Sequence, residues 1–60
     1  MNKFKKFRTR HGLSQEELAK MLGVTQAAIS LLEAGKHRES KPVAMLFEKL
    51  RREYGLVKLS

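Results

Sequence analysis

Apolar and polar residues alternate along this 60-residue chain with the period of α-helices. Four glycines divide the chain into segments, and each segment carries apolar residues three and four positions apart: Gly12, Gly23, Gly35 and Gly55. Nothing alternates with a period of two for long enough to indicate a strand, and the tail 56–60 is too short to assign. The pattern therefore predicts an all-α fold, a compact bundle of four or five short helices in a single domain, residues 1–60.

The first two predicted helices lie on either side of Gly12. The first has one face made of Phe4, Phe7, Arg8 and His11. The second begins with a capping box, in which Ser14 and Glu17 bond to each other's backbone amides. Its apolar stripe consists of Leu18, Ala19, Met21 and Leu22. We expect that whole stripe, Met21 included, to lie in the core.

The third and fourth predicted helices also have marked ends. Thr25 is the expected N-cap of the third helix, and Gly35 is the residue that follows its C-terminal end. Ser40 can cap the fourth helix, with Pro42 in its first turn. The apolar face of the fourth helix consists of Val43, Leu46, Phe47, Leu50 and Tyr54. We expect this helix to end near Tyr54, which leaves a C-terminal tail, residues 55–60, of uncertain structure.

The charge of the chain narrows the choice of partner. Thirteen Lys and Arg against six Asp and Glu give a net charge of +7. Residues 1–11 contain five cations and no acid: Lys3, Lys5, Lys6, Arg8 and Arg10. Such an excess favours a polyanion, either nucleic acid or an anionic membrane surface, although a solubilising surface is the alternative interpretation.

Several other classes of function lack the residues they need. The chain has no cysteine, so neither a disulfide nor a thiolate metal site is expected, and His11 and His37 lie too far apart in sequence to suggest a metal site. No arrangement of side chains suggests a nucleophile with a general base, so we expect no enzymatic activity and no cofactor. No apolar run has the roughly 18 residues of a membrane span, and residues 1–12 lack the apolar region of a signal peptide. We expect a cytoplasmic protein.

The third predicted helix has two unlike faces. One consists of Ala28, Ile29, Leu32 and Glu33, and the apolar members of this face suit a core. The other consists of Gln26, Ala27, Ser30 and Leu31. All four are uncharged, and Gln26 places a long amide at the start of the helix. A helix with such a face fits the major groove of DNA, which is about 12 Å wide. There a glutamine can make a bidentate contact with adenine, worth about 1–3 kcal/mol of discrimination.

The stretch LSQEELAKMLGVTQAAISLLEAG, residues 13–35, resembles the helix-turn-helix of the Cro and phage-repressor type, also called XRE-like. The shared pattern is Leu-Ser-Gln-x-x-Leu-Ala-x-x-Leu-Gly-Val-Thr-Gln-x-x-Ile-Ser-x-x-Glu-x-Gly, and the likeness extends over residues 4–50. It implies a helix-turn-helix at about 14–34, with Ala19 small for helix contact and Gly23 at positive φ. It also implies a recognition helix, 25–34, in the major groove of double-stranded DNA. The implied function is a sequence-specific, Cro-like or repressor-like transcriptional regulator of a prokaryotic cell or phage.

The resemblance also assigns roles to individual residues. The implied base-reading residues are Gln26, Ala27, Ser30 and Leu31. The implied phosphate-binding residues are Gln15, Thr25, Lys36, Arg38, Lys41, Lys5 and Lys6. In the family pattern Gln15 bonds a phosphate and also braces Gln26. Arg8 and Glu33 match a partly buried salt bridge that belongs to the scaffold. Glu39 does not suit a phosphate-binding loop, and we expect it to face away from DNA.

The expected partners are double-stranded DNA and a second copy of the chain, with the homodimer formed in solution or only on DNA. The tail residues Leu56, Val57 and Leu59 either cover the core or pair with that copy. One alternative is an antitoxin-type or other protein-interaction module, marked by an apolar patch at Met45, Leu56 and Leu59. Another is a cationic amphipathic peptide acting at membranes, which the capping box and the glycines disfavour. We expect no membrane partner and no small-molecule ligand.

Overall fold

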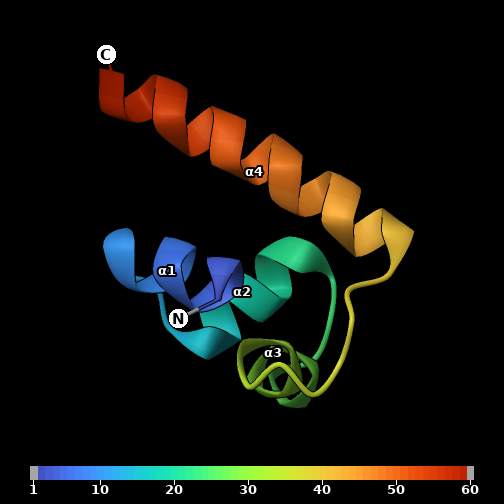
Figure 1. Ribbon diagram of the computed structural model, residues 1–60. Coiled ribbons are helices and arrows are strands. Elements are labelled where there is room, and N and C mark those ends of the chain that lie inside the picture. Colours follow the sequence, from blue (N-terminus) through green and yellow to red (C-terminus); the bar gives the residue numbers. More distant parts are fainter. Residues whose placement is uncertain (1, 60) are drawn as a thin grey trace.

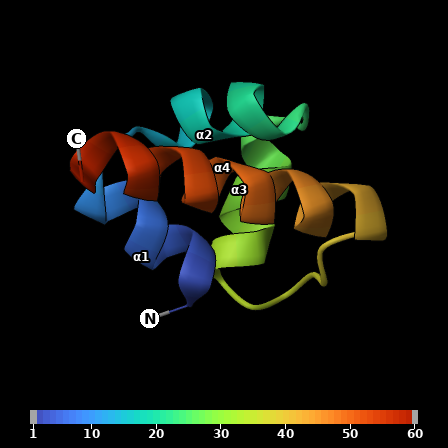
Figure 2. The same cartoon turned by 90° about the horizontal axis from the view of Figure 1, so that it is seen from above.

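The computed structural model describes the backbone of residues 2–59 and the side chains of residues 2–55. It contains four helices, α1 (Lys3–Arg10), α2 (Gln15–Leu22), α3 (Gln26–Glu33) and α4 (Lys41–Leu59), which confirms the all-α prediction with four helices. α4 runs along one side of the domain and α3 lies on the opposite side (Figure 1). Seen from above, α1 and α2 lie on either side of α4 (Figure 2). The described part of the chain holds no helix with both the length and the hydropathy that crossing a membrane requires.

Local hydrogen bonds explain why α2 ends where it does and why α3 follows at once. The predicted capping box is present: the Ser14 hydroxyl accepts from the Glu17 amide at 3.0 Å, and the Glu17 carboxylate accepts from the Ser14 amide at 2.8 Å. Gly23 has φ 70°, as predicted, and the next amide, of Val24, donates to the Ala19 carbonyl at 2.9 Å. The Thr25 hydroxyl then accepts from the Ala28 amide at 3.1 Å. Only residues 23–25 separate the two helices.

The core lies between α4 and the other three helices. Its buried side chains are Phe4, Phe7, Leu18, Ala19, Leu22, Ile29, Leu32, Val43 and Phe47. An aromatic cluster joins α1 to α4: the Phe4 and Phe47 ring centroids are 4.6 Å apart, and those of Phe7 and Tyr54 are 5.2 Å apart. Such aromatic pairs add about 0.5–1.5 kcal/mol each beyond the area they bury. α4 therefore holds α1 firmly while α2 and α3 pack beneath it.

Two apolar side chains predicted to face inward are exposed. Met21 is 39% exposed and Leu46 is 44% exposed. The inward face of α4 follows Val43, Phe47, Leu50 and Tyr54, and position 46 is turned about 100° away from position 47. Met21 lies at the edge of the α2 stripe, where its sulfur accepts a hydrogen bond from the Tyr54 hydroxyl at 3.9 Å. Both predictions were wrong because they depended on where α4 crosses the domain.

The predicted end of the fourth helix was also wrong. α4 continues through Gly55 to Leu59, because Gly55 is not among the glycines with positive φ and so does not turn the chain. The expected roles of Leu56, Val57 and Leu59 concern side chains that lie outside the described residues.

Candidate nucleic-acid interface

One face of α3 is anchored in the core and the other is open to solvent. Ile29 is fully buried and Leu32 is 7% exposed, so this helix cannot rotate without removing both from the core. The exposed residues of α3 include all four that the resemblance assigns to base reading: Gln26, Ala27, Ser30 and Leu31. Because only residues 23–25 connect α2 to α3, α2 and the core hold this uncharged face at a defined angle.

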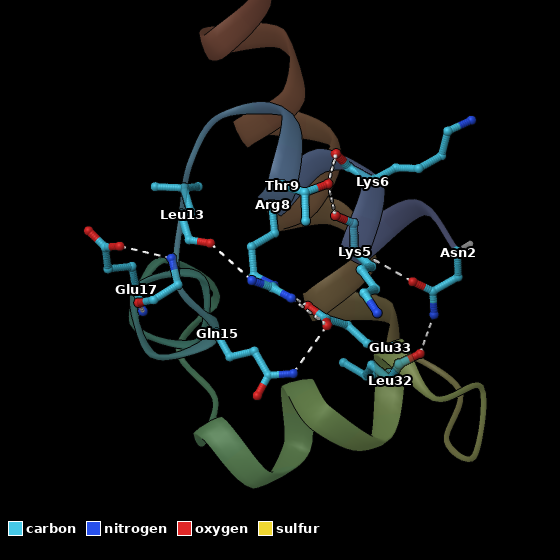
Figure 3. Close-up of polar contacts among 11 residues, drawn as sticks. Asn2, Lys5, Lys6, Arg8, Thr9, Leu13, Gln15, Glu17, Leu32 and Glu33 are labelled. Carbon is cyan, nitrogen blue, oxygen red and sulfur yellow. Dashed lines mark hydrogen bonds and ion pairs between the residues drawn. The ribbon is translucent and has the colours of Figure 1, made fainter.

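Behind this face, Arg8 of α1 and Glu33 of α3 form a bidentate ion pair (Figure 3). Arg8 Nε donates to Glu33 Oε2 at 2.7 Å and Arg8 Nη2 donates to Glu33 Oε1 at 3.1 Å. Arg8 Nη1 also donates to the Leu13 carbonyl at 3.1 Å. The two side chains are only 17% and 5% exposed, so the pair is largely shielded from water. It ties α1 to the C-terminal turn of α3.

The ion pair shifts the pKa of both partners. Burial acts to raise the pKa of Glu33, but the hydrogen bonds from Arg8 and Gln15, with the charges of Arg8 and Lys5, outweigh it and leave that pKa below its ordinary value. The hydrogen bond to Glu33 raises the pKa of Arg8. The pair is therefore ionised at neutral pH, and Glu33 remains an acceptor for three donors.

The third donor is Gln15, at the start of α2. Its Nε2 donates to Glu33 Oε1 at 3.1 Å (Figure 3). In the described part of the chain Gln15 makes no hydrogen bond to Gln26, the residue it was expected to brace, because a charged carboxylate is the stronger acceptor. The second N–H of this amide is left for another acceptor. Gln15 thus connects the scaffold ion pair to the surface beside α3.

The residues after α3 carry most of the remaining positive charge on this side. Lys36, Arg38 and Lys41 are exposed, in the connection 34–40 and the first turn of α4. Glu39, the acid expected to face away from DNA, is partly buried and forms an ion pair with Lys3 of α1, which lowers the pKa of the Glu39 carboxyl. Because Lys3 balances the negative charge of Glu39, the cations of the connection are not offset by that carboxylate.

A contact that the sequence did not suggest also fixes the end of α3. The Asn2 side chain caps α1 by accepting from the Lys5 amide at 3.1 Å, and its Nδ2 donates to the Leu32 carbonyl. Asparagine directly before a helix indicates an N-cap, and this local signal could have identified Asn2 as a structural residue. Its bond to α3 could not be read from the sequence.

The cations of α1 point in different directions. The Lys5 ammonium is directed toward Glu33 and α3, whereas Lys6 extends away from them (Figure 3). Lys6 instead lines a groove between α1 and α4, together with Arg10 and Arg51. Consecutive helical positions are about 100° apart, so Lys5 and Lys6 leave the helix in different directions. Of the two, only Lys5 lies on the side of the exposed α3 face.

No metal centre accompanies this surface within the described residues, because no three His, Asp or Glu side chains there are close enough to hold an ion. The interface is thus built from amides, hydroxyls, small side chains and cations.

Comparison with known proteins agrees with this geometry. The model of the helix-turn-helix family matches residues 4–59. An HTH-type transcriptional regulator of Methanocaldococcus jannaschii is 44% identical over 48 residues, which cover 80% of this chain and 73% of that protein. Another, of Archaeoglobus fulgidus, is 43% identical over 42 residues, covering 70% of this chain and 60% of that protein. No solved structure gives a significant match. The predicted resemblance is confirmed: the chain belongs to the XRE/Cro-like helix-turn-helix family of DNA-binding domains.

Proposed function

We propose that this domain is the sequence-specific, double-stranded-DNA-binding part of a Cro-like or repressor-like transcriptional regulator, with α3 as the helix that enters the major groove. The observation that carries the proposal is the exposed, uncharged face of α3, held in place by two buried residues on its opposite side, Ile29 and Leu32. The two similar proteins described above, both HTH-type transcriptional regulators, support the same conclusion.

Base reading falls to the exposed face of α3. Gln26 is the first residue of the helix, and its side chain is exposed. On the major-groove edge of adenine its amide can donate to N7 and accept from the N6 amine. Ala27 and Ser30 are small enough to let the helix approach the base edges. Leu31, 37% exposed, offers an apolar contact to a thymine methyl group.

Phosphate contacts come from both sides of α3. The second N–H of Gln15, the Thr25 hydroxyl and the N-termini of α2 and α3 supply donors on one side. Lys36, Arg38 and Lys41 supply cations on the other, and Lys5 adds one from α1. These contacts set position and affinity but carry no sequence information.

The regulator acts as a homodimer, formed in solution or on DNA. An eight-residue recognition helix covers only a few base pairs. Two copies related by a two-fold axis would place their helices in successive major grooves, about 34 Å apart.

A binding selection against random duplexes, at two salt concentrations, tests the proposal. Gln26→Ala should change the enriched base pattern, whereas Lys36→Ala should weaken binding to every sequence without changing the pattern. An unchanged pattern with Gln26→Ala would contradict the base-reading role. Failure of the wild-type domain to bind any duplex at low salt would exclude DNA binding altogether.

A second candidate is an antitoxin-type or other protein-interaction module that uses the same domain. Met45 is 68% exposed and Leu46 is 44% exposed on the outer side of α4, and neighbouring exposed apolar side chains favour a protein contact. A double Met45→Lys, Leu46→Lys variant tests the second candidate. It should retain duplex binding under the first candidate and lose a co-purifying protein partner under the second.

A further inference from the structure

The groove between α1 and α4 lies away from the proposed DNA-binding face. Its volume is about 620 Å³, within the range of small-molecule sites, about 300–1,000 Å³. Its lining includes Lys6, Phe7, Arg10 and His11 on the α1 side and Arg51 and Gly55 on α4. Of the described residues that line the groove, none belongs to α2, α3 or the connection 34–40. α1 and α4 lie beside each other when seen from above (Figure 2), whereas α3 is on the opposite side of the domain from α4 (Figure 1).

The α1 wall of the groove carries cations without compensating acids. Lys6 and Arg10 are four residues apart and therefore neighbours on one face of the helix. Residues 1–11 contain no acid. Among the described residues, the other cations of the groove have carboxylate partners, Lys3 with Glu39 and Arg51 with Glu48, but Lys6 and Arg10 have none. Like charges at this spacing destabilise a helix, so an anion between them would relieve the repulsion.

The floor of the groove is aromatic. The Phe7 and His11 ring centroids are 4.7 Å apart, and His11 lies at the same distance, 4.7 Å, from the Tyr54 ring. His11 is partly exposed, so one side of this cluster faces the groove. Cations beside an aromatic surface suit a ligand that has both phosphate groups and a planar ring system.

At Gly55, no described side chain fills the α4 side of the groove. A Cβ atom at this position would meet nothing within 4 Å, so core packing does not require a glycine there. Glycine within a helix lowers stability relative to alanine, which makes its presence in α4 a cost with no packing benefit. The space without a side chain belongs to the groove.

We propose that this groove is a binding site for a nucleotide-sized organic phosphate. Its phosphate groups lie between Lys6 and Arg10, and its planar ring lies against the His11–Phe7 surface. The sequence alone predicted no small-molecule ligand, because the groove exists only once α4 lies along α1. The proposal rests on residues outside the DNA-binding face, so it stands or fails independently of the proposed function.

Titration of the intact domain with ATP tests the site, by calorimetry and by amide chemical shifts. We expect saturable binding to one site, with shifts at the amides of Lys6, Arg10 and Gly55. The double variant Lys6→Ala, Arg10→Ala should weaken ATP binding by about tenfold or more. Gly55→Leu fills the groove without changing any charge and should weaken binding similarly. Inorganic tripolyphosphate, which lacks a ring, should bind about tenfold more weakly than ATP.

The matched control is Lys36→Ala, Arg38→Ala, which removes the same number of charges from the other side of the domain and should leave ATP affinity within about twofold. Thermal melts of each variant establish that it is folded. The amide shifts that ATP causes in the wild-type domain test the location of the site even if a variant does not fold. The proposal would be overturned if the control variant lost as much ATP affinity as Lys6→Ala, Arg10→Ala, or if the amide shifts centred on residues 26–38. It would also be overturned if tripolyphosphate bound as tightly as ATP, or if the wild type bound no ATP.

Discussion

Replacing Glu33 by glutamine tests whether the ion pair behind α3 holds the domain together. The change keeps the volume of the side chain but removes its negative charge. In the wild type the Glu33 carboxylate accepts hydrogen bonds from Arg8, at 2.7 and 3.1 Å, and from Gln15, at 3.1 Å. Arg8, 17% exposed, is then left without its counter-ion. Removing one partner of a fully buried pair costs about 3–5 kcal/mol.

The partial exposure of Arg8 and its remaining bond to the Leu13 carbonyl reduce this penalty. We therefore expect Glu33→Gln to lower the free energy of unfolding by about 2–3 kcal/mol. A domain of this size is stable by only about 3–9 kcal/mol, so the loss should be a large fraction of the total. With about 4–8 °C per kcal/mol, the melting temperature should fall by about 10–20 °C.

Urea unfolding at pH 7, followed by circular dichroism, measures this loss. The matched control is Glu48→Gln: Glu48 pairs with Arg51 at 3.1 Å, but both side chains are more than half exposed, and the expected loss is below about 0.5 kcal/mol. The double variant Arg8→Met, Glu33→Met should be more stable than Glu33→Gln, because it leaves no charge unpaired. Equal losses for Glu33→Gln and Glu48→Gln, or a double variant that is less stable still, would refute the reasoning.

Three further predictions follow from other contacts. The pKa values of Glu33 and Glu39 are lowered in the folded state. The contribution of these carboxylates to stability is therefore complete above the ordinary glutamate pKa, about 4.5, and is lost as the pH falls through the lower folded values. Between pH 7 and pH 3 the melting temperature should therefore drop less for Glu33→Gln than for the wild type. Gly55→Ala should raise the free energy of unfolding by about 0.5–1 kcal/mol, measured in urea, and a destabilised variant would mean that the open space at Gly55 is misassigned. Lys5→Ala should reduce the log–log salt slope of duplex binding by about one unit whereas Lys6→Ala should not, and equal slopes for the two variants would contradict the directions assigned to these side chains.

The parts of this domain that could be predicted from sequence are those governed by local signals. The capping box at Ser14, the left-handed turn at Gly23 and the N-cap at Thr25 each depend on residues within four positions, and all three are present. The two faces of α3 follow from helical periodicity, and the four residues of its predicted outer face are exposed.

The features that were missed depend on how distant elements meet. Met21 and Leu46 carry the right chemistry for a core, but the path of α4 leaves both exposed. Gln15 bonds to Glu33 rather than to Gln26, and Glu39 finds Lys3, through contacts between residues 18 and 36 positions apart. Gly55 was interpreted as a helix end, although glycine permits a turn without requiring one.

The carboxylate of Glu33 is shared by three helices, since it belongs to α3 and accepts from Arg8 of α1 and Gln15 of α2. Detaching α1 or α3 separates the two charges, and detaching α2 removes the Gln15 donor from the carboxylate. Opening any of the three helices therefore breaks at least one hydrogen bond to Glu33, and we expect the amides of α1, α2 and α3 to exchange with solvent deuterium at similar free energies.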